Sequence, residues 1–413
     1  MKIAFFTDTY YPQLNGVTIS VDNFAKELRK RGHTVYIFAP RIKKRRSHID
    51  EDLTNLNTIK LLSIESPIYI PMPTTYTEYK KLFRLDFDIV HAHGNGAFSL
   101  LGYQVARMKR VPYILTFHTL LTKYTHYILK GKVIKPKMVE TGLRVFANLC
   151  DNIITPSEKM KKELLRYGVK KPIEVIPNFI EKDDFRKVEK NYLHKKLHLP
   201  NDTPILLSVG RLGKEKNFEF VIDVFKELTH HDHKTHLVIV GHGTDSKKLK
   251  KRTEELGLSK RIHFTGKINK KNMPSVYEDA SIFVFASVSE VHPLVTLEAC
   301  AAGLPLIVAK DAAFTNVVVD KKNGFMLPLN QKQFVEKILL LLKDEKLRTE
   351  MGKYSLQIID KNFPADVLTD SLLKIYNHVL EVKREIKKSQ RINNAAVRRL
   401  VQTTKMLDRF FTG

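Results

Sequence analysis

The sequence predicts an α/β protein made of two doubly wound domains. Short apolar runs alternate with helical patterns along most of the chain, which is typical of parallel sheets covered by helices. The alternation occurs twice, and a charged stretch over residues 179–200 that contains no predicted strand separates the halves. We therefore expect an N-terminal domain over residues 1–180 and a C-terminal domain over residues 181–360. A helix over 361–382 and a basic amphipathic tail over 383–413 follow.

Composition and charge limit the class of protein. A chain of 413 residues with 43% hydrophobic residues can form two full cores. Its two cysteines, Cys150 and Cys300, lie far apart in sequence, which favours a reducing compartment over a disulfide framework. No run approaches the roughly 18 apolar residues of a membrane span. The chain enters a strand near residue 3 without a signal-peptide pattern, so we expect a cytoplasmic protein.

The net charge is the unusual global feature. The chain has 70 Lys and Arg against 44 Asp and Glu, a formal charge of +26. Such a charge favours a polyanionic partner, which could be nucleic acid, anionic lipid or a phosphorylated ligand. The alternative is that the charge reflects a general basic composition and serves no specific partner. No nucleic-acid-binding module is recognisable, so a nucleic-acid partner is not expected.

The first half carries polar groups where predicted strands end. Its strands are expected over residues 2–6, 34–38, 88–93, 113–117, 152–155 and 173–176. Gly16 begins a predicted helix, and its backbone N–H would be able to bind a phosphate there. The alternative is that the glycine is required only by the turn before the helix. His91 and His93 end one strand, but no third ligand lies at matching spacing, and no metal site is predicted. His118 follows another strand and precedes a stretch rich in aromatic and hydroxyl groups, as in an acceptor pocket.

Two segments combine basic and apolar residues. A helix over residues 74–84 would suit the surface of an anionic membrane, although an ordinary amphipathic helix docked on its own domain fits equally well. Its candidate membrane contacts are Tyr79, Lys80, Lys81, Phe83 and Arg84. From residue 381 to the end, nine Lys and Arg face three Asp and Glu, a net charge of +6. This tail is expected to contact a membrane surface, nucleic acid or a second copy of the chain.

The second half has a strand–loop–helix segment suited to a diphosphate. Its strands are expected over residues 204–209, 236–240, 262–268, 282–286, 306–309 and 324–327. Gly210, Arg211 and Lys216 lie between the first of these strands and a helix from about residue 218. The guanidinium, the ammonium and the helix N-terminus would together bind phosphate oxygens, although a solvated basic loop is the alternative.

Two carboxylates stand eight residues apart in the same half. Glu290 is expected in the loop after the strand over 282–286, and Glu298 in the first turns of the next helix. Ligands of parallel α/β sheets bind at the carboxyl ends of the strands, and carboxylates accept hydrogen bonds from sugar or ribose hydroxyls. The alternative is a solvated loop charge and a glutamate that favours a helix N-terminus.

These residues resemble the donor site of retaining glycosyltransferases of family 4, which have the GT-B fold of two Rossmann-like domains. The resemblance runs along nearly the whole chain. It includes Tyr10-Tyr11-Pro12-x-x-Asn15-Gly16-Val17, Asp88-Ile89-Val90-His91-x-His93, Thr116-x-His118-Thr119, Pro156-Ser157 and Val175-Ile176-Pro177-Asn178. Within the family, the segments at 124–128, 131–132 and 135–139 are most similar to bacterial 1,2-diacylglycerol 3-glucosyltransferases, which glycosylate a membrane lipid from UDP-glucose.

The resemblance implies a role for each matching residue. Arg211 and Lys216 would neutralise the donor diphosphate in place of a metal, and Gly16 would offer its N–H to a phosphate from the facing domain. Glu298 would bind the ribose and Glu290 the donor sugar. The remaining implied contacts are the base near Ile268, the nucleotide sugar at Gly210 and Leu294, and the sugar and acceptor at His118.

The resemblance also implies the setting. The two domains would face each other across a cleft, with a helix from about Phe363 crossing back to the N-terminal domain. No cofactor would be needed, and the partners would be UDP-glucose, a lipid acceptor and an anionic membrane surface, with the enzyme peripheral at the inner face of the cell membrane.

One position departs from the family pattern. Pro293 stands where the family has glycine between the two glutamates, and proline offers no N–H to a ligand. The departure predicts a lost donor contact or a reshaped loop. Two alternatives follow: a family 4 enzyme with a soluble sugar or another lipid as acceptor, and a non-catalytic basic protein on the same scaffold that binds lipid or nucleic acid.

Overall fold

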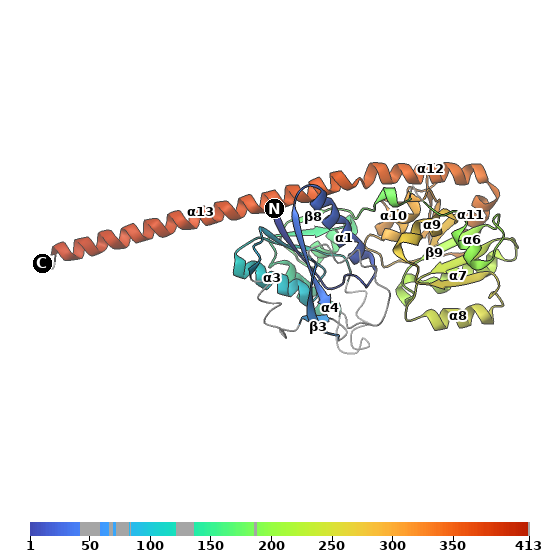
Figure 1. Cartoon of the computed structure of the whole chain (residues 1–413), viewed down its shortest axis with the longest axis horizontal. Coiled ribbons are helices and arrows are strands. Elements are labelled where there is room, and N and C mark those ends of the chain that lie inside the picture. The colour runs from blue at the N-terminus through green and yellow to red at the C-terminus, as the bar shows by residue number, and fades with distance from the viewer. Residues whose placement is uncertain are drawn as a thin grey trace.

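The protein has two α/β domains joined along one side by a long C-terminal helix (Figure 1). The computed structural model describes residues 1–41, 58–65, 69–71, 82, 84–120, 136–185 and 188–411, with side chains of the last helix described as far as residue 389. The structure therefore has the predicted fold class, α/β with two doubly wound domains and a helix that crosses back.

The N-terminal domain is built on an eight-stranded sheet in the order β4-β3-β2-β1-β5-β6-β7-β8. All neighbouring strands are parallel except β3 and β4. The strand order reverses between β1 and β5, and a crevice for a ligand is expected where the order reverses. The strands are β1 (Lys2–Thr7), β2 (Thr34–Arg41), β3 (Thr58–Glu65), β4 (Tyr69–Pro71), β5 (Ile89–His93), β6 (Tyr113–Thr116), β7 (Asn152–Thr155) and β8 (Ile173–Val175).

Helices connect these strands, and local sequence sets their ends. The first, α1 (Gly16–Lys30), begins where the Asn15 side chain accepts a hydrogen bond from the Thr18 N–H over 3.0 Å, a normal N-cap. Arg29 and Lys30 occupy its last turn, where cations favour the helix dipole. The other described helices of this domain are α3 (Ala97–Lys109), α4 (Pro136–Ala147) and α5 (Glu158–Arg166).

The C-terminal domain has a six-stranded, fully parallel sheet in the order β11-β10-β9-β12-β13-β14. Its order reverses between β9 and β12, so the loops after these two strands form a second crevice. The strands are β9 (Ile205–Val209), β10 (His236–Val240), β11 (Ile262–Gly266), β12 (Ile282–Phe285), β13 (Leu306–Ala309) and β14 (Gly324–Leu327). The α-helices are α6 (Tyr192–Leu197), α7 (Phe218–Leu228), α8 (Ser246–Glu255), α9 (Met273–Glu278), α10 (Leu294–Ala301), α11 (Gln331–Lys343) and α12 (Glu345–Asn362).

The long helix α13 (Ala365–Phe411) packs across the N-terminal domain and projects beyond it (Figure 1). Arg31, at the end of α1, donates to the Asp370 carboxylate over 2.7 Å and to the Asp366 carbonyl over 2.8 Å. Leu372 and Tyr376 are buried in an apolar cluster that continues into the C-terminal domain. The helix thus ties the two domains together through one continuous core.

Three sequence predictions need comment. The separate helices expected over 361–382 and 383–413 are wrong, because α13 is one continuous helix and its sequence contains no glycine or proline that would interrupt it. Strands β3 and β4 were not predicted, since their mixed polar and apolar residues lack the continuous apolar run of a buried strand. Of the proposed membrane contacts, Tyr79, Lys80, Lys81 and Phe83 lie outside the described residues, and Arg84 is exposed.

Candidate active site between the two domains

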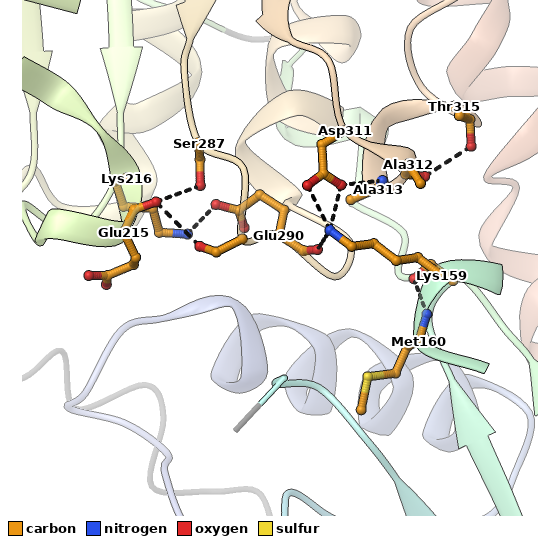
Figure 2. Close-up of polar contacts among 12 residues, drawn as sticks. Lys159, Met160, Glu215, Lys216, Ser287, Glu290, Asp311, Ala312, Ala313 and Thr315 are labelled. Atoms are coloured by element: carbon orange, nitrogen blue, oxygen red, sulfur yellow. Dashed lines mark hydrogen bonds and ion pairs between the residues drawn. The ribbon is translucent and has the colours of Figure 1, made fainter. Parts of the chain in front are cut away.

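The loop after β12 and the loop after β9 are bound to each other in the C-terminal crevice (Figure 2). The Lys216 ammonium lies 2.5 Å from Oε1 of Glu290, and only 16% and 9% of these side chains are exposed. The hydroxyls of Ser287 and Ser289 donate to the Glu215 carbonyl over 3.1 and 3.3 Å. Nδ2 of Asn217 also donates to the Ala286 carbonyl over 3.4 Å. One ion pair and three hydrogen bonds therefore hold the cation loop (residues 210–217) against the carboxylate loop (residues 286–293).

The second predicted cation of this crevice is also paired. Arg211 donates to Oε1 of Glu215 over 2.6 Å while 57% of its side chain is exposed. Both predicted phosphate ligands are thus neutralised by carboxylates of the same two loops. A diphosphate that entered the crevice would compete with these carboxylates for the two cations.

A close approach of two backbone segments supports the cation loop. The Gly210 N–H donates to the Val240 carbonyl over 3.0 Å. Gly241 follows with φ of 138°, and a Cβ atom there would lie 1.8 Å from the Gly210 carbonyl oxygen. Only glycine fits at position 241, because a side chain there would collide with the Gly210 carbonyl, which directly precedes Arg211.

Glu298 lies in α10 in a largely apolar setting. Burial raises the pKa of its carboxyl from 4.5 to about 7. The Tyr277 hydroxyl donates to Oε2 of Glu298 over 2.7 Å, and this hydrogen bond and the nearby Lys270 lower that pKa in part. The carboxyl therefore keeps one oxygen tied to Tyr277 and titrates near neutral pH.

Pro293 does not disrupt the helix that follows it. It has φ of −75° and ψ of 115° and serves as the N-cap of α10, which begins at Leu294. The Pro293 carbonyl accepts from the Thr296 N–H over 3.2 Å and from the Thr296 hydroxyl over 2.7 Å. A helix N-terminus, which is favourable for an anion, is thus present at the crevice although position 293 itself has no N–H.

The N-terminal domain places the start of α1 opposite this helix. A Cβ atom on Gly16 would lie 3.8 Å from Cδ1 of Leu294, an ordinary contact distance. The N-termini of α1 and α10 therefore meet across the cleft. Ile268, the predicted neighbour of the base, is partly buried against the core cluster that joins the domains.

Three histidines gather at the carboxyl ends of β5 and β6. Nδ1 of His93 lies 3.2 Å from Nε2 of His118, and the rings of His91 and His93 are stacked 4.2 Å apart. Nδ1 of His91 lies 2.6 Å from the Tyr376 hydroxyl of α13, and its Nε2 lies 2.7 Å from the Thr116 hydroxyl. Burial lowers the pKa of His91 to about 3 and that of His118 to about 4, so both rings are neutral at pH 7.

These contacts bear on metal binding. The sequence spacing offered no third ligand beside His91 and His93, but the fold brings His118 next to them from the end of β6. The rings form hydrogen bonds with each other and with hydroxyl groups. Within the part of the chain that the structure describes, no group of three or more His, Cys, Asp or Glu is arranged to hold a metal ion.

The sequence matches two protein families, one for each domain. The family described as "Glycosyltransferase Family 4" matches residues 14–184, and the family described as "Glycosyl transferases group 1" matches residues 189–357. The two matches are separated by four residues and together take in most of both domains, although β1 lies before the first match. The chain belongs to the glycosyltransferases.

Two relatives of this glycosyltransferase carry the same description. The alpha-monoglucosyldiacylglycerol synthase of Streptococcus pneumoniae is 29% identical over 415 residues, with 94% of this chain and 93% of the relative covered. The alpha-monoglucosyldiacylglycerol synthase of Acholeplasma laidlawii is 26% identical over 393 residues, with 92% of this chain and 98% of the relative covered.

Solved structures share the fold of the glycosyltransferase. HepE of Anabaena in complex with UDP-glucose has a TM-score of 0.74 at 17% identity, with 92% of this chain and all of that chain covered. Sucrose-phosphate synthase from Thermosynechococcus elongatus has a TM-score of 0.74 at 19% identity, with 92% and 99% covered. These likenesses concern the fold alone.

The structure gathers most of the predicted site residues at the facing edges of the two sheets. The C-terminal crevice holds Gly210, Arg211, Lys216, Glu290, Leu294 and Glu298, and the N-terminal domain presents Gly16 and His118 from the ends of β1 and β6. Sequence reasoning missed the partners of these residues, namely Glu215, Tyr277 and Lys159, and it also missed Tyr376, the partner of His91. Glu215 stands four residues after Arg211, a spacing that could have indicated the pair, whereas the other three become neighbours only through folding.

Proposed function

We propose that this glycosyltransferase moves a glucosyl group from UDP-glucose to a membrane lipid such as diacylglycerol, with retention of configuration. The observation that supports the donor half is the pair of cations, Arg211 and Lys216, in the loop after β9, with Lys216 paired to Glu290 of the loop that leads into α10. Two relatives described as alpha-monoglucosyldiacylglycerol synthases support the choice of sugar and acceptor.

Charge stabilisation is the main task of such a site. The bond between the anomeric carbon and the diphosphate breaks, so negative charge grows on the departing phosphate oxygen. In this proposal Arg211, Lys216 and the N-termini of α1 and α10 stabilise that charge without a metal ion. Glu298 accepts hydrogen bonds from the ribose, and Glu290 turns from Lys216 toward hydroxyls of the donor sugar.

The acceptor would approach from the N-terminal domain. His118 is neutral at pH 7, so it can exchange hydrogen bonds with hydroxyls of the sugar and acceptor without a fixed charge. We propose front-face attack, in which the acceptor hydroxyl adds to the anomeric carbon on the side of the leaving diphosphate. The acceptor proton passes to that phosphate oxygen, so the products are the α-glycoside and UDP.

A basic and apolar surface supports a membrane acceptor. In α4 the side chains of Lys137, Met138, Arg144 and Val145 are exposed, with Met138 at 60% and Val145 at 58%. Cations with exposed apolar groups suit the headgroup region of an anionic bilayer. In the described residues no helix is long and apolar enough to cross a membrane. We therefore propose peripheral binding at the inner face of the cell membrane.

The direct test is glycolipid synthesis by the pure full-length protein. Radiolabelled UDP-glucose is incubated with vesicles of phosphatidylglycerol that contain diacylglycerol, and the lipid fraction is analysed for a glucosyl product. We expect a labelled glycolipid and equimolar UDP. No product with any sugar nucleotide would refute the proposal, while turnover with a soluble sugar and no sedimentation with vesicles would favour the soluble-acceptor alternative.

A further inference from the structure

A lysine of the N-terminal domain reaches across to the C-terminal domain beside the carboxylate loop, which contains Glu290 (Figure 2). Nζ of Lys159, on α5, lies 2.5 and 2.7 Å from the two carboxylate oxygens of Asp311. Asp311 lies between β13 and the short helix η8 (Ala312–Phe314). Only 18% of the Lys159 side chain and 8% of the Asp311 side chain are exposed, so solvent screens this ion pair weakly.

The Lys159 ammonium also binds the carboxylate loop. Nζ of Lys159 donates to the Glu290 carbonyl over 2.9 Å, while the Glu290 carboxylate binds Lys216. Glu290 is therefore held at its backbone by one domain and at its side chain by the other. A movement of α5 away from the C-terminal domain would remove the backbone contact.

A second side chain of the N-terminal domain holds the same loop. Nδ2 of Asn178 donates to the His292 carbonyl over 3.4 Å, and Oδ1 of Asn178 accepts from the Ser20 hydroxyl over 2.8 Å. Two carbonyls of the loop, at Glu290 and His292, thus accept hydrogen bonds from across the cleft. The charged and shorter of the two contacts is that of Lys159, which makes it the dominant one.

The Asp311 carboxylate is also held by a backbone group of its own domain. Oδ1 of Asp311 accepts from the Ala313 N–H over 2.8 Å and so caps η8. Because Lys159 and Asp311 belong to different domains, their ion pair requires α5 to lie against the segment before η8, as it does in this structure. The ion pair is therefore a feature of the packed domains and not of either domain alone.

We propose that Lys159 and Asp311 form an interdomain latch that positions Glu290 for the donor sugar when the domains close. The inference rests on the proposed donor site, in which Glu290 binds the sugar. Lys159 is a positioning residue here, since it acts through the backbone of Glu290. The latch links closure of the cleft to the conformation of the carboxylate loop. The loop therefore takes the conformation that binds the donor sugar only when the N-terminal domain contacts the C-terminal domain.

The test compares Lys159→Met, Asp311→Asn and the double variant in the full-length protein. Asparagine at 311 keeps an oxygen that can cap η8, so the folded domain is preserved. Lys162→Met, which removes an exposed lysine of the same helix, is the matched control. Hydrogen–deuterium exchange of residues 287–292 and the kinetic constants for UDP-glucose are measured for each protein.

Both single variants should show faster exchange in residues 287–292 and a KM for UDP-glucose raised about tenfold, with the KM for the acceptor unchanged. The double variant should show no larger change in exchange or in KM than Lys159→Met alone, because the two substitutions remove the same interaction. The control should behave as wild type. Additive losses, or exchange in Lys159→Met equal to that of the control, would overturn the latch.

Failure of the proposed function is separable from failure of the latch. If the wild-type protein turns over no sugar nucleotide, the proposed function fails, whereas the exchange measurement still decides whether Lys159 orders the loop. If turnover is present and unaffected by Lys159→Met, the latch fails and the proposed function stands.

Discussion

The variant Glu290→Gln separates the two roles that the structure gives this carboxylate. Glu290 neutralises Lys216 at 2.5 Å in a mostly buried pair, so a diphosphate must displace the carboxylate to reach the ammonium. A glutamine side chain would keep the size and a neutral acceptor oxygen but would release the cation. We expect nucleoside diphosphate to bind more tightly and the sugar to be transferred more slowly.

The size of the effect follows from the kind of hydrogen bond that is lost. A hydrogen bond to a charged group contributes about 1.5–3 kcal/mol and a neutral one about 0.5–1.5 kcal/mol, so the variant removes about 1–2 kcal/mol of competition. This corresponds to an affinity for UDP that is about 5- to 30-fold higher. Turnover should fall by at least about tenfold, because the charged acceptor for the sugar hydroxyls is gone.

Isothermal titration calorimetry with UDP alone measures the first effect, and release of UDP from UDP-glucose measures the second. Glu254→Gln, which removes an equal charge from the exposed surface of α8, controls for the change in overall field. A variant that binds UDP no more tightly than wild type would show that Glu290 does not compete for the diphosphate-binding cation, and the assignment of Lys216 to the phosphate would be wrong.

Three further outcomes are expected. Burial raises the pKa of Glu298 to about 7, so its stabilising protonation is complete below about pH 4.5 and lost as the pH rises through about 7. The unfolding free energy of wild type measured against Glu298→Gln should then fall by about 2–3 kcal/mol between pH 5 and 8, and a flat difference would contradict the burial. Dialysis against EDTA should leave turnover unchanged, because Arg211 and Lys216 supply the positive charge; recovery on adding Mg²⁺ would contradict this. Gly16→Ala should keep its melting temperature, since its Cβ would lie 3.8 Å from Leu294, yet lose about tenfold in affinity for UDP, because the added methyl group would hinder the close approach of a phosphate to the N–H of residue 16. Unchanged binding there would exclude Gly16 from the phosphate site.

The sequence reached the fold class and most of the strands because these rest on local patterns. Buried parallel strands such as β9 and β12 are continuous apolar runs, and their burial on both faces of a sheet requires that pattern. The loops that follow them carry Arg211, Lys216 and Glu290, so the strand pattern also placed these groups at one edge of a sheet. Charge and spacing predicted groups suited to a diphosphate and to hydroxyls, and the resemblance to family 4 glycosyltransferases implied a sugar nucleotide as the ligand.

Contacts between residues that are far apart in the chain could not be predicted from the sequence. Lys159 and Asp311 are separated by 152 positions, and His91 and Tyr376 by 285, so no local period relates them. Each pair depends on how the two domains and α13 pack, which is the sum of many apolar contacts. The same holds for the single long α13, whose charged sequence suggested two segments although no residue within it breaks a helix.

The sequence by itself determined the chemistry of this protein: a strongly basic α/β chain with cations and carboxylates where predicted parallel strands end. Only the tertiary structure decided how those charges are held. It paired Lys216 with Glu290, hydrogen-bonded Glu298 to Tyr277 and brought Lys159 across the cleft. The physical reason is that ionic contacts and pKa values depend on distance and burial, and both are set by packing between segments that are remote in the chain.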